Sequence, residues 1–301
     1  MDSVSIVRDS SLTGSDIVGD LQLDWSVYSD VGRVRDANED AALVLPGRYL
    51  IADGMGGHES GELASEAALQ TLAEVEPGAD LADTRATLDH LLDLAQQRIG
   101  SIDGFSERRA GTTVTGAVLV TDDDAPHWLI LNIGDSRTYR YQNGTLQQLT
   151  RDHSQVQEFV DAGVITAEQA RIDPRRNVIT RALGAGMAEP DADYFSTAAL
   201  PGDVLLICSD GLTGELPDPE MADILAGSDS VEEAAASLVD AALFVGAHDN
   251  VTVVVVAVST DDGVQSDGDM QSDETMQSDE HESDDGELES SEQSTAAETS
   301  T

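Results

Sequence analysis

The sequence predicts an α+β sandwich, and two observations lead to this fold class. Apolar runs of about four to eight residues rich in Val, Ile and Leu recur along the chain, which is typical of buried β-strands. Between two groups of these runs lie segments with apolar residues at intervals of three and four, which predict paired helices over residues 61–75 and 84–99. Runs of strands interleaved with paired helices are expected to pack as sheets covered by helices.

The remaining elements follow the same two periodicities. A helical, charged pattern fills residues 149–183, and residues 152–160 resemble a capped helix entry. A further helix is expected over residues 231–244. The turn Asn143-Gly144 predicts a hairpin within residues 139–146. The other expected strands are residues 25–29, 41–45, 49–52, 113–121, 127–133, 204–208 and 251–258.

The two ends of the chain differ in composition from the middle. Residues 1–20 are rich in Ser and Asp without a clear period, so we expect a flexible N-terminal arm. Residues 260–301 repeat an acidic hexad and contain almost no apolar residues, so we expect a disordered acidic tail with partner docking as the second interpretation. We expect residues 21–259 to form a single domain.

Charge and composition exclude several classes of function. The formal net charge is −44, and the 15 basic residues are all Arg, so every chemistry that needs a lysine is excluded. The negative charge argues against binding to nucleic acid or to an anionic membrane, although general adaptation to salt explains it equally well. A single cysteine, the absence of a signal-peptide pattern and the absence of a run of ~18 apolar residues predict a cytoplasmic protein, which we expect to be a monomer.

Aspartates lie beside the predicted strands in five separate segments. These segments are residues 35–40, 53–58, 134–137, 209–212 and 249–250, and four of them directly follow or precede an apolar run. Carboxylates at the ends of several buried strands can converge on one point, where they repel each other unless a cation lies between them. Hard divalent ions prefer ligand sets made only of oxygen, so the sequence predicts a site for Mg²⁺ or Mn²⁺.

The order of these motifs resembles the metal-dependent protein phosphatases, the PPM or type 2C serine/threonine phosphatases, in their bacterial or archaeal form. The matching segments, which also include Ala110-Gly111-Thr112-Thr113, fall within residues 24–258. Each segment alone is weak, because Asp-Gly and Ser-Asp are common in turns, but six in the family's order are specific. The resemblance implies a four-layer α/β/β/α sandwich with two central antiparallel sheets and helices outside. It also implies that residues 149–183 form a flap beside the site.

The resemblance assigns roles to eight residues of this chain. Asp53 would bridge two Mn²⁺ or Mg²⁺ ions, and the Gly54 carbonyl would bind one of them. Asp210 and Asp249 would hold the second ion, with Glu39 and Asp40 near it, directly or through water. Asp135 matches the position that helps to bind a weaker third ion. Arg35 would grip the substrate phosphate, the alternative being a surface arginine paired with one of many acids.

The function implied by the resemblance is hydrolysis of phosphoserine and phosphothreonine in proteins, by direct attack of a water that bridges two metal ions. The substrates would be phosphoproteins that are targets of Ser/Thr kinases. Two alternatives remain open: a hydrolase of small phosphomonoesters, and a phosphatase-like regulatory binding protein (pseudophosphatase). Intact Asp53, Asp210 and Asp249 argue against the second of these, since a binding module has no use for clustered like charges.

Supporting residues and the proton donor are less well defined. We expect Thr112, Thr113 and Arg137 to support the site by packing or pairing, and Asn250 to orient Asp249. Met55 stands where eukaryotic relatives place a histidine proposed as the general acid. His58, His153 and His248 are the remaining candidates, and we assign none of them. Cys208 lacks the Arg five residues later that thiol phosphatases need, so we expect it to be a small core residue.

Overall fold

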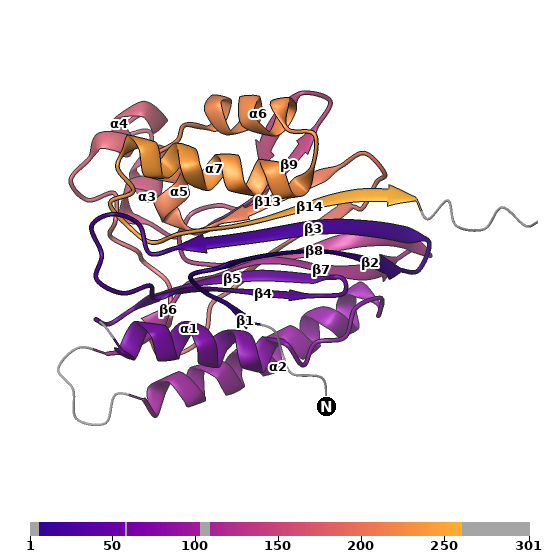
Figure 1. Ribbon diagram of the computed structural model, residues 1–301. Helices are drawn as coiled ribbons and strands as arrows, with labels where there is room; N and C mark the ends of the chain where they lie inside the picture. The colour runs from indigo at the N-terminus through magenta and orange to yellow at the C-terminus, as the bar shows by residue number, and fades with distance from the viewer. Residues whose placement is uncertain (1–5, 58, 103–108, 261–301) are drawn as a thin grey trace, which may run out of the picture. The chain divides into compact units, whose positions relative to one another are not determined.

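The computed structural model describes residues 6–57, 59–102 and 109–260. Within these residues the strands form two antiparallel sheets that lie face to face, with helices covering the outer face of each (Figure 1). The predicted fold class is confirmed. The expected acidic tail lies outside the described residues.

The first sheet has eight strands in the order β1-β4-β5-β7-β8-β12, with β6 pairing both β5 and β11. Its members are β1 (Ile6–Val7), β4 (Asp40–Leu45), β5 (Arg48–Met55), β6 (Gly111–Thr112), β7 (Val114–Asp122), β8 (Ala125–Ile133), β11 (Leu183–Gly184) and β12 (Asp193–Ala198). Helices α1 (Glu59–Leu72) and α2 (Leu81–Gly100) cover its outer face.

The second sheet has six strands in the order β10-β9-β13-β14-β3-β2. They are β2 (Ser11–Val18), β3 (Leu21–Asp30), β9 (Arg137–Gln142), β10 (Thr145–Gln148), β13 (Val204–Cys208) and β14 (Val251–Thr260). The outer face is covered by α6 (Asp218–Gly227) and α7 (Val231–Val245), and α5 (Asp210–Thr213) follows β13 directly. Helices α3 (Gln155–Asp161) and α4 (Ala167–Ile172) form the segment predicted as a flap.

Burial on both faces explains why the central strands show no alternation in the sequence. In β13, Leu205 and Ile207 pack into the core between the sheets, whereas Leu206 and Cys208 pack against α6 and α7. The same division holds in β4, where Ala42 and Val44 face the second sheet and Leu43 faces α1 and α2. Each strand therefore anchors two cores, and its end is held rigidly where it meets the site.

The predicted flexible arm over residues 1–20 is wrong for the residues that the structure describes. Ser11–Val18 forms the edge strand β2, which pairs with β3 through a tight turn at Gly19 (φ +62°). Its side chains are mostly exposed or half-buried, so the strand carries no apolar alternation that the sequence could reveal. The Asp16 carboxylate accepts a hydrogen bond of 2.6 Å from the Trp25 indole and fixes the strand in place.

None of the helices in the described ranges combines the length and the apolar composition that crossing a bilayer requires.

Candidate active site

Strand ends from both sheets bring the predicted site residues to one depression with a volume of about 310 Å³. Asp53 lies near the end of β5, Asp135 lies in the turn between β8 and β9, Asp210 begins α5, and Asp249 precedes β14. The lining also includes Arg35, Glu39, Gly54 and Met55. Segments separated by up to 214 positions along the chain, as Arg35 and Asp249 are, therefore meet at one site.

Asp40 is the one predicted residue that does not line the depression. It lies opposite Asp53 in the β4–β5 register and is buried, with 1% of its surface exposed. Its Oδ2 accepts a hydrogen bond of 2.7 Å from the Ser209 hydroxyl. This position behind Asp53 favours an indirect influence on an ion over direct contact with it.

The carboxylates of the site strongly perturb one another. Burial, followed by the charges of Asp40, Asp210 and Asp249, raises the pKa of Asp53 well above its usual value. Burial and the charge of Asp210 likewise raise the pKa of Asp135. Removal from water raises the pKa of Asp40 to about 7 and, with the charge of Asp249, that of Asp210 to about 6. Carboxylates with such pKa values lack enough positive charge around them.

Arg35 is the only arginine of the described residues that lines this depression. Its Nη2 donates to Asp249 Oδ2 at 2.6 Å, and 46% of its side chain is exposed. Burial lowers its pKa, but the charges of Asp249, Asp53 and Glu39 outweigh burial and raise it. The guanidinium thus faces the carboxylate group and still has donors for a ligand.

Glycines allow the close packing behind the site. A Cβ on Gly54 would lie 2.2 Å from the Gly61 carbonyl oxygen and 2.6 Å from that of Glu39. A Cβ on Gly61 would lie 2.7 Å from Glu39 Oε1. Helix α1 therefore packs directly on β5 and on the Glu39 segment, a role for Gly61 that its position in a helical pattern did not reveal.

Hydrogen bonds between the Asp53 backbone and two threonine hydroxyls fix the geometry around Asp53. Its amide donates to Thr113 Oγ1 at 3.1 Å, and its carbonyl accepts from Thr112 Oγ1 at 2.9 Å. The expectation that these two threonines support the site agrees with these contacts. Arg137 also pairs inward as expected, with Asp152 at 2.7 Å.

Asn250 supports the site through its side chain and through its backbone. Its Oδ1 accepts from the Glu39 amide at 2.9 Å, and its Nδ2 donates to the carbonyls of Val31 and Ala37. The backbone amide of Asn250 donates to Asp249 Oδ1 at 2.8 Å. The side chain therefore holds the loop that carries Arg35 and Glu39.

Two of the three candidate histidines form contacts elsewhere. His153 Nδ1 accepts from the Gly134 amide at 3.1 Å, and Nε2 lies 3.2 Å from Asp193. His248 Nδ1 lies 2.7 Å from Glu215 Oε1, outside the lining of the depression. His58 lies outside the described residues. No general acid is assigned to the site.

Cys208 is fully buried, and burial raises the pKa of its thiol. It packs among the residues between the second sheet and its helices. A buried neutral thiol cannot act as a nucleophile toward a phosphoprotein.

The residues present fit a divalent cation. They supply oxygen ligands only, and burial together with the neighbouring carboxylates raises the pKa values of Asp53 and Asp210, which shows that little positive charge offsets these effects. Among the described residues, however, no three His, Cys, Asp or Glu side chains converge tightly enough to define an ion position by themselves. The metal ligands are therefore assigned from the aspartate motifs of the sequence and from the mutual effect of these carboxylates on their pKa values.

Comparison with known proteins identifies the class. The family model described as protein phosphatase 2C matches residues 33–243. The chain belongs to the protein phosphatase 2C family.

Individual relatives extend over most of the chain. It is 36% identical over 239 residues to the serine/threonine phosphatase stp of Listeria welshimeri, a match that covers 76% of this chain and 93% of the relative. The crystal structure of the Mycobacterium tuberculosis serine/threonine phosphatase PstP superposes with a TM-score of 0.71 at 36% identity, covering 79% of this chain and 99% of that one. A structure of the PstP catalytic domain with two manganese ions gives a TM-score of 0.68 at 35% identity, with the same coverage.

Proposed function

We propose that this protein is a metal-dependent phosphatase that hydrolyses phosphoserine and phosphothreonine in proteins. The observation that carries the proposal is the group of carboxylates from distant segments, Asp53, Asp135, Asp210 and Asp249, which line one depression with too little positive charge around them. Such an arrangement costs stability unless a cation is bound, so its presence indicates a metal centre.

We propose that Asp53, the Gly54 carbonyl, Asp210 and Asp249 hold two ions, Mn²⁺ or Mg²⁺, with Glu39 beside them and Asp135 available to a third. When bound, such ions supply a water of lowered pKa and neutralise charge on phosphoryl oxygens. Asp40 and Thr113 act indirectly, the first through its charge on Asp53 and the second through the Asp53 amide.

Arg35 is proposed to bind the substrate phosphate. Its side chain reaches the depression from the loop between β3 and β4, and Asp249 holds one of its nitrogens. A planar guanidinium with free donors matches two phosphate oxygens at once. This contact positions the phosphorus over the carboxylate group without forming a covalent bond to the protein.

We further propose that the substrates are targets of Ser/Thr kinases and that the protein acts as a monomer. The net charge of −44 disfavours nucleic acid and anionic membranes as partners.

The test is hydrolysis of a phosphothreonine peptide with Mn²⁺, Mg²⁺ or EDTA, for the wild type and for Asp53→Asn. We expect turnover with either ion, none in EDTA, none with Asp53→Asn, and full turnover after thiol alkylation. Asp93→Asn is the matched control, because Asp93 is an exposed carboxylate of α2. Turnover in EDTA would contradict the proposal, and hydrolysis of p-nitrophenyl phosphate without any peptide hydrolysis would favour a small-molecule enzyme.

A further inference from the structure

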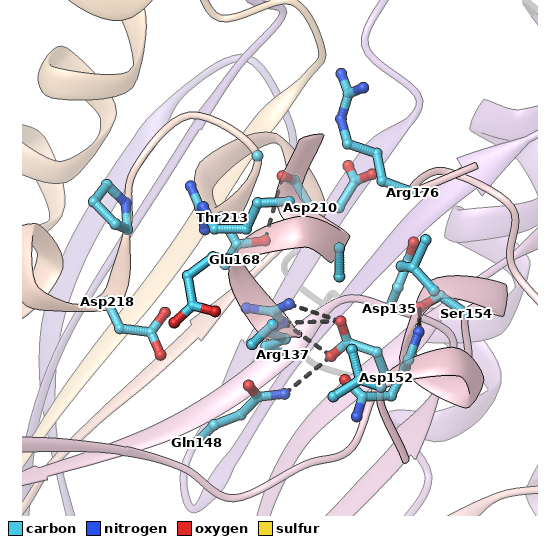
Figure 2. Close-up of a pocket in the computed structure, with 18 of the residues that line it drawn as sticks. Asp135, Arg137, Gln148, Asp152, Ser154, Glu168, Arg176, Asp210, Thr213 and Asp218 are labelled. Atoms are coloured by element: carbon cyan, nitrogen blue, oxygen red, sulfur yellow. Dashed lines mark hydrogen bonds and ion pairs between the residues drawn. The ribbon is translucent and has the colours of Figure 1, made fainter. Parts of the chain in front are cut away.

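A second pocket of about 370 Å³ adjoins the candidate active site (Figure 2). It lies between the segment of α3 and α4 on one side and the start of α5 and α6 on the other. The two cavities share three lining residues, Asp135, Asn177 and Asp210. One bound molecule can therefore place different groups in the two cavities.

Two arginines that line this pocket lack the partners that most of the other described arginines have. Eight of the described arginines form ion pairs, as expected in a protein with 59 acidic residues. Arg33 and Arg48 bind backbone carbonyls, and Arg85 lies over the Tyr194 ring. Arg171 and Arg176 are exposed, and within the described part of the chain their side chains form no hydrogen bond or ion pair.

The pocket is polarised. Arg137 is neutralised by Asp152, and Asp135 and Asp210 are candidate metal ligands. In Figure 2, Glu168 and Asp218 lie in the part of the view opposite Arg176, which lies on the side of Asp210. The charge of Arg176 also reaches Glu215 and contributes to lowering the pKa of that carboxylate. Unpaired positive charge thus borders the active site.

We propose that Arg171 and Arg176 bind an anionic side chain of the substrate that lies close in sequence to the phosphorylated residue. The ligand is a carboxylate or a second phosphate, since both accept hydrogen bonds from a guanidinium. An extended peptide advances ~3.3 Å per residue, so a side chain two or three positions away can reach the neighbouring pocket. This inference rests on the proposed phosphatase function and names its preferred substrates: phosphopeptides with an acidic or second phosphorylated residue near the target.

The test compares peptides that share one phosphothreonine and differ only in their flanks. One set has neutral flanks, a second has a single glutamate moved through the neighbouring positions, and a third has a second phosphothreonine there. Kinetics are measured with Mn²⁺ at constant ionic strength for the wild type, Arg171→Gln, Arg176→Gln and the double variant. p-Nitrophenyl phosphate, which has no flanking residue, reports the chemistry alone.

We expect kcat/KM of the wild type to be about five- to tenfold higher for the best anionic peptide than for the neutral one, the size of a partly exposed charge-assisted contact. Arg176→Gln and the double variant should lose this preference through KM and leave p-nitrophenyl phosphate unchanged. The glutamate and phosphothreonine sets distinguish a carboxylate ligand from a phosphate ligand.

Arg175→Gln is the matched control, because Arg175 adjoins Arg176 but pairs with Asp173 at 2.8 Å and lies over the Phe159 ring. It should retain the preference. Equal rates for neutral and anionic peptides, or an equal loss in Arg175→Gln, would overturn the inference while the phosphatase function stands. Failure to hydrolyse any of the peptides would overturn both.

Discussion

Two groups of charged side chains begin within a few residues of each other in the sequence. In only one of them does the protein supply opposite charges that neutralise each other. Arg137 forms a two-pronged pair with Asp152, and Tyr139 and Gln148 complete the hydrogen bonds around it. Asp135, two residues before Arg137 in the sequence, belongs to the second group, the carboxylates of the candidate active site. It faces Asp210 and Asp53, and the pKa values of Asp135 and Asp53 are raised. The first group stabilises the fold, and the second requires a cation from outside. Paired charge marks structure here, and unbalanced charge marks function.

The largest change in stability is expected from breaking the balanced group. Arg137→Gln leaves the Asp152 carboxylate buried and unpaired, so it should lower the free energy of unfolding by about 3 kcal/mol. Arg151→Gln removes a pair with Asp161 whose side chains are 46% and 39% exposed, and it should cost at most about 0.5 kcal/mol. Urea unfolding in EDTA measures both. Equal losses would show that the Arg137 pair is no more important than a surface pair.

Removing one charge from the unbalanced group should affect stability and activity in opposite directions. Asp210→Asn relieves repulsion, so in EDTA it should raise the free energy of unfolding, on the order of 1 kcal/mol. It also removes a proposed ligand, so Mn²⁺ affinity and turnover should fall together by at least about 100-fold. Isothermal titration calorimetry measures the Mn²⁺ affinity, and peptide hydrolysis measures the turnover. The control variant Asp93→Asn should match the wild type in both measurements. Retained activity with lowered stability would mean that Asp210 is structural.

Arg35 combines features of both groups: one of its guanidinium nitrogens pairs with Asp249, and its remaining donors can bind a ligand. Arg35→Ala should raise KM for a phosphothreonine peptide about tenfold and change kcat little, since the proposed contact exists in ground and transition states alike. Arg33→Ala is the control, because Arg33 Nε binds the Leu243 carbonyl at 2.7 Å outside the depression. A collapse of kcat at constant KM would instead assign Arg35 to the transition state.

The sequence predicted the central strands and the aspartates at their ends, because buried runs and Asp-Gly turns are local patterns. It did not predict β2, whose exposed face carries no alternation, or β12, whose residues Asp193–Ala198 are only partly buried. The contact of Asn250 with the Glu39 amide crosses 211 positions and has no local signature. Arg171 and Arg176 stand out only when the partners of the other arginines are known. Long-range packing decides such features, and one sequence does not reveal it.

The central claim is that the carboxylate group needs a cation, and the dependence of stability on pH tests it most directly. With raised pKa values, Asp40 (about 7) and Asp210 (about 6) hold protons in the folded protein that the unfolded chain releases near pH ~4. Their contribution is therefore present at low pH and lost as pH rises through about 6 to 7. Burial lowers the pKa of His153, so this residue makes the protein more stable as pH rises. Its effect opposes that of the carboxylates, but it is a single group and they are several.

The measurement is thermal unfolding between pH ~5 and ~7.5, with EDTA and with saturating Mn²⁺, a range that spans these titrations. In EDTA the unfolding temperature should fall as pH rises, and Asp210→Asn should flatten this fall. Mn²⁺ must displace protons to bind, so its stabilisation should be larger at the higher pH. An unfolding temperature in EDTA that stays level or rises with pH, together with no effect of Mn²⁺ at either pH, would contradict the account.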